Sequence, residues 1–519
     1  MSVASRNLLE DGCLLPEGWL PISLAEIASD VSYGYTAKST LDNVGPQLLR
    51  ITDIQDNRVD WANVPFCEID EEKKQKYLLR SGDLVFARTG ATVGKSFLIK
   101  GDIPESVYAS YLIRVRTLSE DSIEYLTHFF QSSDYWDQIT ELSSGIGQPN
   151  VNGTKLKNLR VPFAPAAEQK VIADKLDQLL AQVENTKARL DRIPDILKRF
   201  RQSVLAAAVS GKLTEEWRES IDLPNIDELQ ATVKHERKIA WLSEQAKSAM
   251  RKGLEFEEVS ALRKYKEPVS GYNDEFKLTQ IHCAPKEWLV SNLDSVAIAV
   301  TGKTPSTTDA GNWGGEIPFI SPSQITTTGG ITEPERYVSK VGSIKTPILP
   351  EGSILIVCIG TIGKVGLLDK ESAFNQQINA LISTGVIKRE FLFMWAQTLH
   401  NWLNKTSSAV VNAAIINKSR LCSAPCPLPS IEEQTEIVRR VEQLFAHADK
   451  IEQQVQQAQE RVNKLTQSIL AKAFRGELTE QWRKAHPELI SGENSAEALL
   501  AKIKAEREVV KPKKKLKRK

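Results

Sequence analysis

A lysine that follows two glycines is the first candidate for chemistry in this 519-residue chain. Gly90, Gly94 and Lys95 resemble part of a loop whose backbone N–H groups cradle phosphate, and Ser96 stands where such a loop places its Mg²⁺ ligand. That loop needs four residues between its glycines, but only three separate Gly90 from Gly94. The next segment, 97–99, reads as a strand where a helix is required. We therefore expect a strand–turn–strand hairpin with Lys95 at its tip.

Other catalytic signatures are absent from the sequence. There is no His-Glu-x-x-His motif, no Gly-x-Ser-x-Gly nucleophile elbow and no Asn/Asp-Pro-Pro-aromatic stretch of an amino-methyltransferase. The six cysteines are scattered, and the six histidines show no ligand spacing. The sequence thus predicts neither a catalytic centre nor a metal site, and a nucleotide hydrolase acting through Lys95 is kept as an alternative.

In contrast to the missing catalytic motifs, the chain has many side chains of the types that bind nucleic-acid bases and phosphates. Two polar loops, 143–153 and 407–414, precede basic residues. Asn and Gln can bridge adenine edges, Arg and Lys can read guanine, and Lys can hold phosphate. Ordinary surface turns have a similar composition, so the loops alone leave the function open. The candidate DNA contacts are Tyr33, Tyr35, Arg88, Lys95, Gln148 and Asn150 in the first half, and Lys303, Gln324, Lys364, Gln376 and Asn412 in the second.

These candidates lie in two halves of the sequence that repeat each other. Glu168-Gln169 opens one long helical pattern, and Glu433-Gln434 opens another 265 residues later. The patterns close on similar motifs at 211–218 and 476–483, which are again 265 residues apart. No insertion or deletion therefore separates the two helical patterns, and the chain is a duplicated unit with a domain-sized period.

Each helical pattern carries a heptad seam, which is typical of a coiled coil. Because each helix has an equal partner in the same chain, we expect two helices of about 40 residues, roughly 60 Å long, to pair antiparallel. Homodimerisation through the seams is the alternative. Pro194 lies off the first seam and should kink its helix. The first seam is Ile172, Leu176, Leu179, Val183, Thr186, Leu190, Ile193, Leu197, Phe200 and Val204, and the second is Ile437, Val441, Leu444, Ala448, Ile451, Val455, Ala458, Val462, Leu465 and Ile469.

The closing motifs suggest a contact surface for a partner protein. Gly211 and Gly476 stand where a helix can end in a left-handed cap. Trp and Arg favour the cores of interfaces. The candidate partner contacts are Trp217, Arg218, Trp482 and Arg483. Packing of each tryptophan onto its own helix is the alternative.

The segments before the helices are predicted to be globular. Buried-strand runs at 84–87 and 354–357 each follow a glycine turn, and 123–130 and 390–395 suit helices. The fold class is α+β, with two mixed α/β blocks that are each followed by a long helix. The predicted domains are 1–160 (first block), 161–218 (central helix), 219–282 (charged helical spacer), 283–425 (second block), 426–484 (distal helix) and 485–519 (C-terminal helix and basic tail).

The composition, 41% hydrophobic and 26% charged, is that of a soluble globular protein. No window approaches the roughly 18 apolar residues of a membrane span, and the N-terminus lacks a signal pattern, so we expect a cytoplasmic protein. The net charge is +1, but residues 1–160 carry 16 basic and 22 acidic side chains, whereas 511–519 hold seven basic residues in nine. A nucleic-acid site must therefore be a local patch.

The helical segments resemble the specificity subunit of type I restriction-modification systems, in its enterobacterial branch. The resemblance rests on the junction 161–170 and on the segments 193–202 and 465–479. It covers essentially the whole chain, although in the blocks it is only architectural. It implies that each block is a target recognition domain that reads half of a split double-stranded DNA target. It also implies that the helix pair spaces the blocks and docks two modification (methyltransferase) subunits.

The resemblance further implies a complex in which this chain is a non-catalytic subunit without a cofactor of its own. The modification subunits would supply S-adenosylmethionine and adenine methylation. Two restriction (translocase/nuclease) subunits would add cleavage that depends on ATP and Mg²⁺. The segment 219–282 is longer than a spacer between repeats requires, and so departs from the family pattern. A nucleotide hydrolase and a coiled-coil scaffold without DNA contact are the alternatives.

Overall fold

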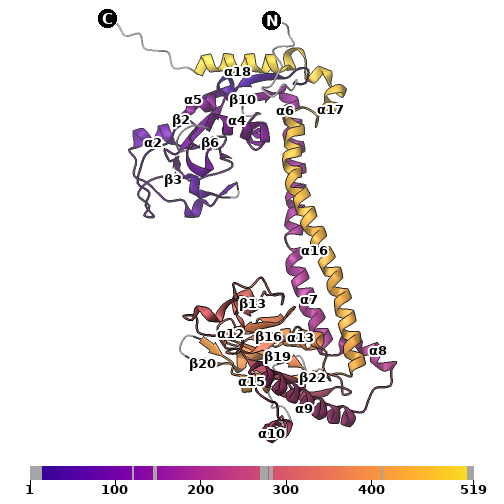
Figure 1. The fold of residues 1–519 in the computed structure, drawn as a ribbon. Helices are drawn as coiled ribbons and strands as arrows, with labels where there is room; N and C mark the ends of the chain where they lie inside the picture. The colour runs from indigo at the N-terminus through magenta and orange to yellow at the C-terminus, as the bar shows by residue number, and fades with distance from the viewer. Residues whose placement is uncertain are drawn as a thin grey trace. The chain divides into compact units, whose positions relative to one another are not determined.

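The computed structural model describes residues 15–55, 57–119, 122–143, 149–268, 279, 284–410 and 413–510 (Figure 1). The chain divides into two compact units, unit 1 with Met1–Asp191 and Val455–Lys519, and unit 2 with Arg192–Gln454. Each unit therefore combines segments from both repeats. We call the globular part from β1 to β10 block 1 and the part from β11 to β22 block 2.

Block 1 is closed by its own ends, because β1 (Leu20–Ser23) pairs antiparallel with β10 (Arg160–Phe163). A short parallel pair, β3 (Gln47–Leu49) with β8 (Ser106–Tyr108), completes its strand framework. The main sheet is antiparallel in the order β2 (Ala28–Tyr33), β9 (Leu112–Thr117), β6 (Leu84–Ala87) and β7 (Ser96–Leu98).

Block 2 repeats this topology. Its ends, β11 (Leu289–Asn292) and β22 (Pro425–Leu428), also pair antiparallel, and β13 (Trp313–Ile320) pairs in parallel with β18 (Ser372–Phe374). The main sheet has the order β12 (Ala297–Thr301), β19 (Ile378–Ser383), β16 (Ile354–Val357) and β17 (Val365–Leu367). The predicted α+β class and the repeat of the blocks are confirmed.

The predicted buried strands and helices of the blocks are also confirmed. All four residues of β6 and of β16 are buried, as expected for central strands between two packed faces. The helix predicted near 123 is α3 (Ile123–Phe129), and the one near 390 is α13 (Arg389–Thr398). Each contributes aromatic side chains to the apolar core of its block.

The long helices pair antiparallel within each unit. In unit 1, α6 (Ala166–Leu190) lies against residues 455–474 of α16 (Ile431–Phe474), because Lys175 near its start contacts the Leu478 carbonyl and Asp191 at its end contacts Gln459. In unit 2, α7 (Ile193–Val209) lies against residues 431–454 in the same sense. The turn at 191–192, just before Pro194, separates α6 from α7, so the predicted interruption is confirmed.

Most seam positions at the outer ends of the helices are buried, including Ile172, Leu176 and Val441. Phe200 and Leu465 are exceptions, because 37% and 46% of their surfaces are exposed. Beside Phe200, Arg201 crosses to Asp449 and Glu452 of α16 at 2.6 and 2.8 Å. Ion pairs therefore add to the helix contact at this level of α7, and Phe200 and Leu465 are more exposed than their predicted seam positions imply.

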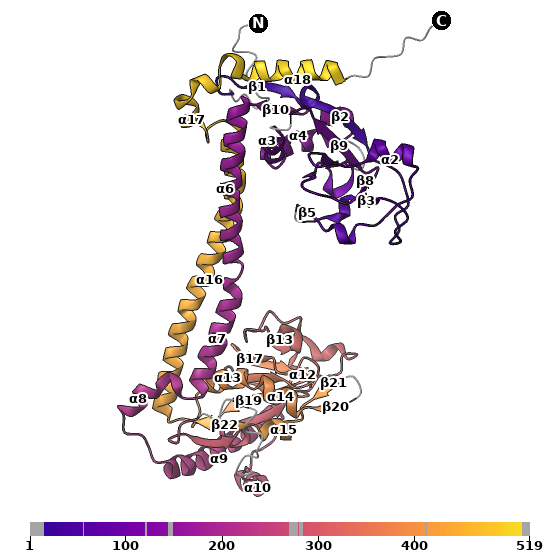
Figure 2. The same cartoon turned by 180° about the vertical axis from the view of Figure 1, so that it is seen from behind.

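The charged segment after the first helix is part of the repeat, which corrects its interpretation as an unmatched spacer. Its main helix, α9 (Ile226–Arg251), packs on α11 (Leu293–Val296) of block 2. Its counterpart, α18 (Ala496–Val510), packs on α1 (Leu24–Ile27) of block 1, and Figure 2 shows it in yellow beside β1.

Each of the two helices docks on its block through an apolar residue and an arginine four positions later. Val233 of α9 and Ile503 of α18 are buried at their blocks. Arg237 donates to the Asp294 carbonyl at 2.9 Å, and Arg507 donates to the Ala25 carbonyl at 2.8 Å. Each repeat therefore ends in a helix that covers a globular block. Among the helices that the structure describes, none is long and apolar enough to span a bilayer.

Candidate functional site

In block 1, the structure brings three of the predicted DNA contacts together at one end of the main sheet. Tyr33 ends β2, Arg88 follows β6, and Asn150 bridges to Thr89 next to Arg88. The guanidinium carbon of Arg88 lies 4.9 Å from the ring centroid of Tyr33. Tyr33 and Asn150 are exposed, and Arg88 is half-buried. We call Tyr33, Arg88 and Asn150 the reading face of block 1.

Two other candidates in block 1 have structural contacts. Tyr35 is half-buried and lies against Tyr77, with ring centroids 5.3 Å apart. The side-chain amine of Lys95 donates to the Ile54 carbonyl at 3.0 Å, so it turns back onto the block instead of standing free at the hairpin tip. The hairpin itself, β6–β7, is confirmed. Because a strand and no helix follows Lys95, nucleotide hydrolysis there has no structural support. Gln148 lies outside the described residues.

In block 2, Lys303 and Gln376 lie at the corresponding end of the sheet. Both are exposed, and the hydroxyl of Thr304, next to Lys303, donates to the Gln376 side chain. Lys303 also lines a groove of about 630 Å³ together with the exposed lysines Lys252 and Lys418. Cations around a groove attract an anionic ligand such as the DNA backbone.

The remaining candidates in block 2 are less favourable. Gln324 is only 3% exposed, and its amide oxygen accepts hydrogen bonds from the backbone N–H and hydroxyl of Ser321. It therefore caps the short helix η10 (Pro322–Gln324), and its assignment as a base contact was wrong. Lys364 is half-buried in the hairpin between β16 and β17. Asn412 lies outside the part of the chain that the structure describes.

The register of the sheets gives the counterparts of the Tyr33–Arg88 pair. Gly34 and Gly302 donate to equivalent carbonyls of β9 and β19, which makes Thr301 the counterpart of Tyr33. Arg88 and Cys358 each follow a central strand, and each carbonyl accepts the N–H of the returning loop. Thr301 bonds Asn379 at 2.7 Å, while Cys358 is buried, and burial raises the pKa of its thiol. Equivalent positions therefore carry different chemistry in the two blocks.

Where α6 begins, unit 1 contains a buried carboxylate that joins three separate segments. Glu168 is fully buried, and it accepts hydrogen bonds from the Trp19 indole at 2.8 Å and the Thr479 hydroxyl at 2.6 Å. Arg483 completes the set with an ion pair to the same carboxylate and lies 5.9 Å from the Trp19 ring. We call this group the unit 1 clasp.

Unit 2 repeats this arrangement where α16 begins. Glu433 is fully buried and accepts from the Trp288 indole at 2.8 Å and the Thr214 hydroxyl at 2.7 Å. Arg218 pairs with this carboxylate and lies 5.9 Å from the Trp288 ring. The closing motif of each helical pattern thus binds the start of the other pattern. We call this group the unit 2 clasp.

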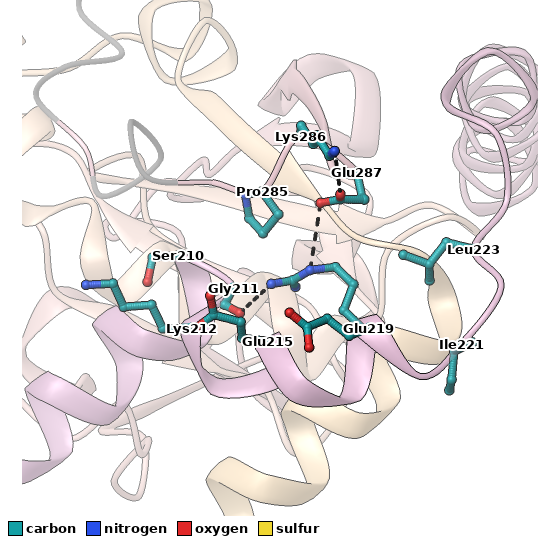
Figure 3. Close-up of a pocket in the computed structure, with 11 residues that line it drawn as sticks. Ser210, Gly211, Lys212, Glu215, Glu219, Ile221, Leu223, Pro285, Lys286 and Glu287 are labelled. Carbon is teal, nitrogen blue, oxygen red and sulfur yellow. Dashed lines mark hydrogen bonds and ion pairs between the residues drawn. The ribbon is translucent and has the colours of Figure 1, made fainter.

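The glycines of the closing motifs allow the clasps to form. Gly211 and Gly476 have φ values of +75° and +72°, as predicted for left-handed caps. A β-carbon at Gly211 would lie 2.4 Å from the ring of Pro285, and one at Gly476 would lie 2.3 Å from the ring of Pro16. The arginine of each clasp also donates to the carbonyl of its glycine, and Arg218 pairs with Glu287 at 3.8 Å. Figure 3 shows Gly211 and Glu287 around this site.

The clasps alter the interpretation of the predicted partner contacts. The charged groups of Arg218 and Arg483 are engaged inside their own units, so neither is free for a partner protein. Trp217 and Trp482 are half-buried, and Trp482 stacks on His486 with centroids 5.0 Å apart. A partner contact through these tryptophans stays a prediction. The sequence shows Glu168 and Glu433 at equivalent starts of the two helical patterns, but it does not connect them to the closing motifs.

Comparison with known proteins places this architecture in a family. Residues 16–195 and 285–461 match the type I restriction modification DNA specificity domain. The EcoBI specificity subunit of Escherichia coli is 34% identical over 97% of this chain and 96% of its own length. The StySPI specificity subunit of Salmonella potsdam is 34% identical over 95% and 96%.

A solved structure supports the same fold. The HsdS subunit from Thermoanaerobacter tengcongensis aligns with a TM-score of 0.54 and 18% identity, over 89% of this chain and 98% of that one. The globular blocks that precede helices, and the helices that pair within units, are thus features of a known architecture. The chain belongs to the family of type I restriction-modification DNA specificity subunits.

Proposed function

We propose that the two blocks of this DNA specificity subunit each read one half of a bipartite double-stranded DNA target. The observation that carries the proposal is the different chemistry at equivalent places of one repeated fold. Block 1 exposes a tyrosine–arginine pair where block 2 has Thr301 bonded to Asn379 and a buried Cys358. Two readers with the same scaffold but different side chains suit two unlike half-sites.

The paired helices would space the two blocks and dock two modification subunits. Supporting this, the exposed Phe200 and Leu465 are equivalent positions of the two helical patterns, one in each unit. Ile196, four residues before Phe200, is 55% exposed as well. Exposed apolar side chains at symmetry-related places favour two copies of one partner.

The chain would act without a catalytic centre or cofactor of its own. The modification subunits would bring S-adenosylmethionine and methylate adenine, and two restriction subunits would bring ATP- and Mg²⁺-dependent translocation and cleavage. This assignment fits the relatives, which are named as specificity subunits of bacterial restriction enzymes. The same relatives favour a cytoplasmic location, where bacterial DNA lies.

Methylome sequencing tests the proposal directly. The chain and its modification subunits are expressed in a host without other adenine methylation. We expect methylation at one target with two unlike parts and a fixed gap. Replacing residues 14–160 with the block of another family member should change one part only, and replacing residues 283–425 should change the other. A continuous target, or a swap that changes both parts, would contradict the assignment of one half-site to each block.

A scaffold that does not contact DNA gives a different result in a binding assay. Complexes of this chain with its modification subunits should bind the methylated target more tightly than random DNA, and added salt should weaken binding to both. Equal affinity for target and random DNA at every salt concentration would favour the scaffold.

A further inference from the structure

We infer that Arg88 reads a guanine in the half-site of block 1, as a bidentate hydrogen-bond donor to the O6 and N7 atoms of that base. The inference rests on the proposed function of block 1 and names one of its specificity-determining residues.

The side chain of Arg88 is held in one orientation. Its guanidinium stacks on the Tyr33 ring at 4.9 Å, and the Tyr33 hydroxyl is fixed by the backbone N–H of Gly153 at 2.8 Å. The carbonyl of Arg88 accepts from the N–H of Val151, which ties its backbone to the neighbouring loop. A stacked, planar guanidinium on an anchored ring loses little further freedom when a ligand binds.

The hydrogen-bonding capacity of Arg88 is unused in the described part of the chain. Its Nε atom is buried without a hydrogen-bond partner, and among the described residues its terminal nitrogens form no hydrogen bond or ion pair. The terminal nitrogens are not among the buried unpaired atoms, so they reach solvent. The terminal amino groups of Arg88 thus remain open to a ligand beside the exposed Tyr33.

A second arginine of block 1 shows what a structural role looks like. Arg114 also stacks on a tyrosine, Tyr108, at 5.1 Å, but only 3% of it is exposed. Its terminal nitrogens donate to the carboxylate of Asp30 at 2.8 Å and to the Leu78 carbonyl at 3.0 Å. Among the described residues, Arg88 has no such acceptors for its terminal nitrogens, so these donors stay available to a ligand.

Guanine fits this arrangement because its major-groove edge presents two acceptors to a planar fork, and this is the commonest specific contact of arginine with DNA. Asn150 is exposed and bridges to Thr89, the residue after Arg88, so a second candidate for base contact lies beside it. A phosphate could bind the same fork, and the experiment below separates the two acceptors. In block 2, the counterpart Cys358 is buried and carries no cation, so the inference concerns the first half-site alone.

The test uses the complete chain assembled with its modification subunits and DNA containing the target found by methylome sequencing. Each guanine of the block 1 half-site is replaced in turn by 7-deazaguanine, which lacks the N7 acceptor. One replacement should weaken binding by the wild-type complex by roughly tenfold or more, since a bidentate pair carries that discrimination. The same replacement should have little effect on a complex carrying R88K, which keeps the charge but not the fork. R80K is the matched control, because Arg80 is exposed before β6 whereas Arg88 follows it.

The outcomes are distinguishable. A block 1 half-site without any G·C pair, or equal sensitivity of wild type and R88K to every 7-deazaguanine, would overturn the inference. If R88K weakens binding to target and random DNA alike, and a methylphosphonate in the backbone reproduces the loss, Arg88 holds a phosphate and the inference is also wrong. Should R88K fail to assemble, R88Q, which removes both the charge and the fork, takes its place in the same comparison with wild type. Failure of the proposed function would appear earlier, as a wild-type complex with no bipartite target.

Discussion

The two clasps occupy equivalent places in the two repeats, and so do the reading face of block 1 and the corresponding end of the block 2 sheet, yet only the clasps have kept their chemistry. Glu168 and Glu433 each receive an indole N–H, a threonine hydroxyl and an arginine. The reading face of block 1 and the corresponding sheet end of block 2 share a backbone register, but Arg88 in block 1 corresponds to the buried Cys358 in block 2.

The difference follows from burial. Every member of a clasp is needed by the others, because removing one leaves a desolvated charge or donor without its partner. Few buried groups rely on a side chain at the exposed end of a strand, so a substitution there leaves the stability of the core nearly unchanged. The duplicated chain could therefore diverge in what it reads while its helix junctions stayed the same.

Removing the clasp carboxylates should give the largest effect. Glu168→Ala removes the counter-ion of the half-buried Arg483, and Glu433→Ala leaves Arg218 with only the more distant Glu287 at 3.8 Å. Each should lower the free energy of unfolding by about 3–5 kcal/mol. Urea unfolding followed by circular dichroism measures the loss. If the clasps are equivalent, the two losses should agree within about 1 kcal/mol, whereas a large loss at one and none at the other would break the comparison.

Glu432→Ala is the matched control for the clasp variants. Glu432 lies beside Glu433 in the first turn of α16 but is exposed. It removes the same charge from the same helix end, so its cost should stay below about 1 kcal/mol. A comparable loss from Glu432→Ala would mean that helix-end charge, and not the clasp, stabilises the junction.

The clasps also show where prediction from sequence ended. Both helical patterns and their closing motifs were visible because the 265-residue period contains no gap. Their pairing was not visible, because the closing motif of each pattern binds the start of the other, and a sequence period does not say which copies touch. Antiparallel packing of the helices produces this exchange, since the end of one lies beside the start of its partner.

Insertions between the repeats explain why the sequence did not reveal the match of α9 or the counterparts of Tyr33 and Arg88. The segment Val233-Lys234-His235-Glu236-Arg237 matches 503–507, but the offset is 270 and not 265, so α9 was taken for a spacer. Thr301 and Cys358 stand at different offsets from Tyr33 and Arg88, and only the strand register aligns them. Gln324 was misassigned because an amide that caps a turn and one that reads a base look identical in sequence.

Replacing the clasp tryptophans also tests whether the two clasps are equivalent, with a smaller expected loss of stability than the glutamate variants. Trp19→Phe and Trp288→Phe keep an aromatic ring but remove the indole N–H that donates to each carboxylate. Each should cost about 1–3 kcal/mol, the penalty for a lost donor to a buried charged group. Thermal unfolding of both variants checks the effect. A double variant of Trp19→Phe with Glu168→Ala should cost less than the sum, because the two residues interact.

The docked helices should show a moderate difference between the units. Arg237 donates to both the carbonyl and the carboxylate of Asp294 and lies 5.3 Å from the Tyr265 ring. Arg507 donates to the Ala25 carbonyl. We expect Arg237→Ala to cost about 2 kcal/mol and Arg507→Ala about 1 kcal/mol, because hydrogen bonds to charged groups contribute more. Hydrogen exchange of α9 and α18 measures the loosening, and a larger effect at Arg507 would reverse this ranking.

The smallest expected effect concerns a histidine that only unit 1 has at its position. His128 of α3 is 8% exposed and contacts Asp177 at 2.8 Å, while its counterpart on α13 is Met394. Burial lowers the pKa of His128, and it outweighs the opposing attraction of the Asp177 carboxylate.

The unfolded chain therefore takes up a proton at His128 near its ordinary pKa of about 6.5, while the folded chain resists protonation until a lower pH. Well above the unfolded pKa, His128 is neutral in both states and adds no pH dependence. The free energy of unfolding should therefore fall as the pH drops from 7 towards 5, because the unfolded chain binds the proton first. His128→Met, which installs the residue of the other block, should flatten this decline in urea unfolding, whereas His447→Met at an exposed site of α16 should not. An unchanged decline in His128→Met would show that acid sensitivity arises elsewhere, and that this difference between the blocks has no consequence for stability.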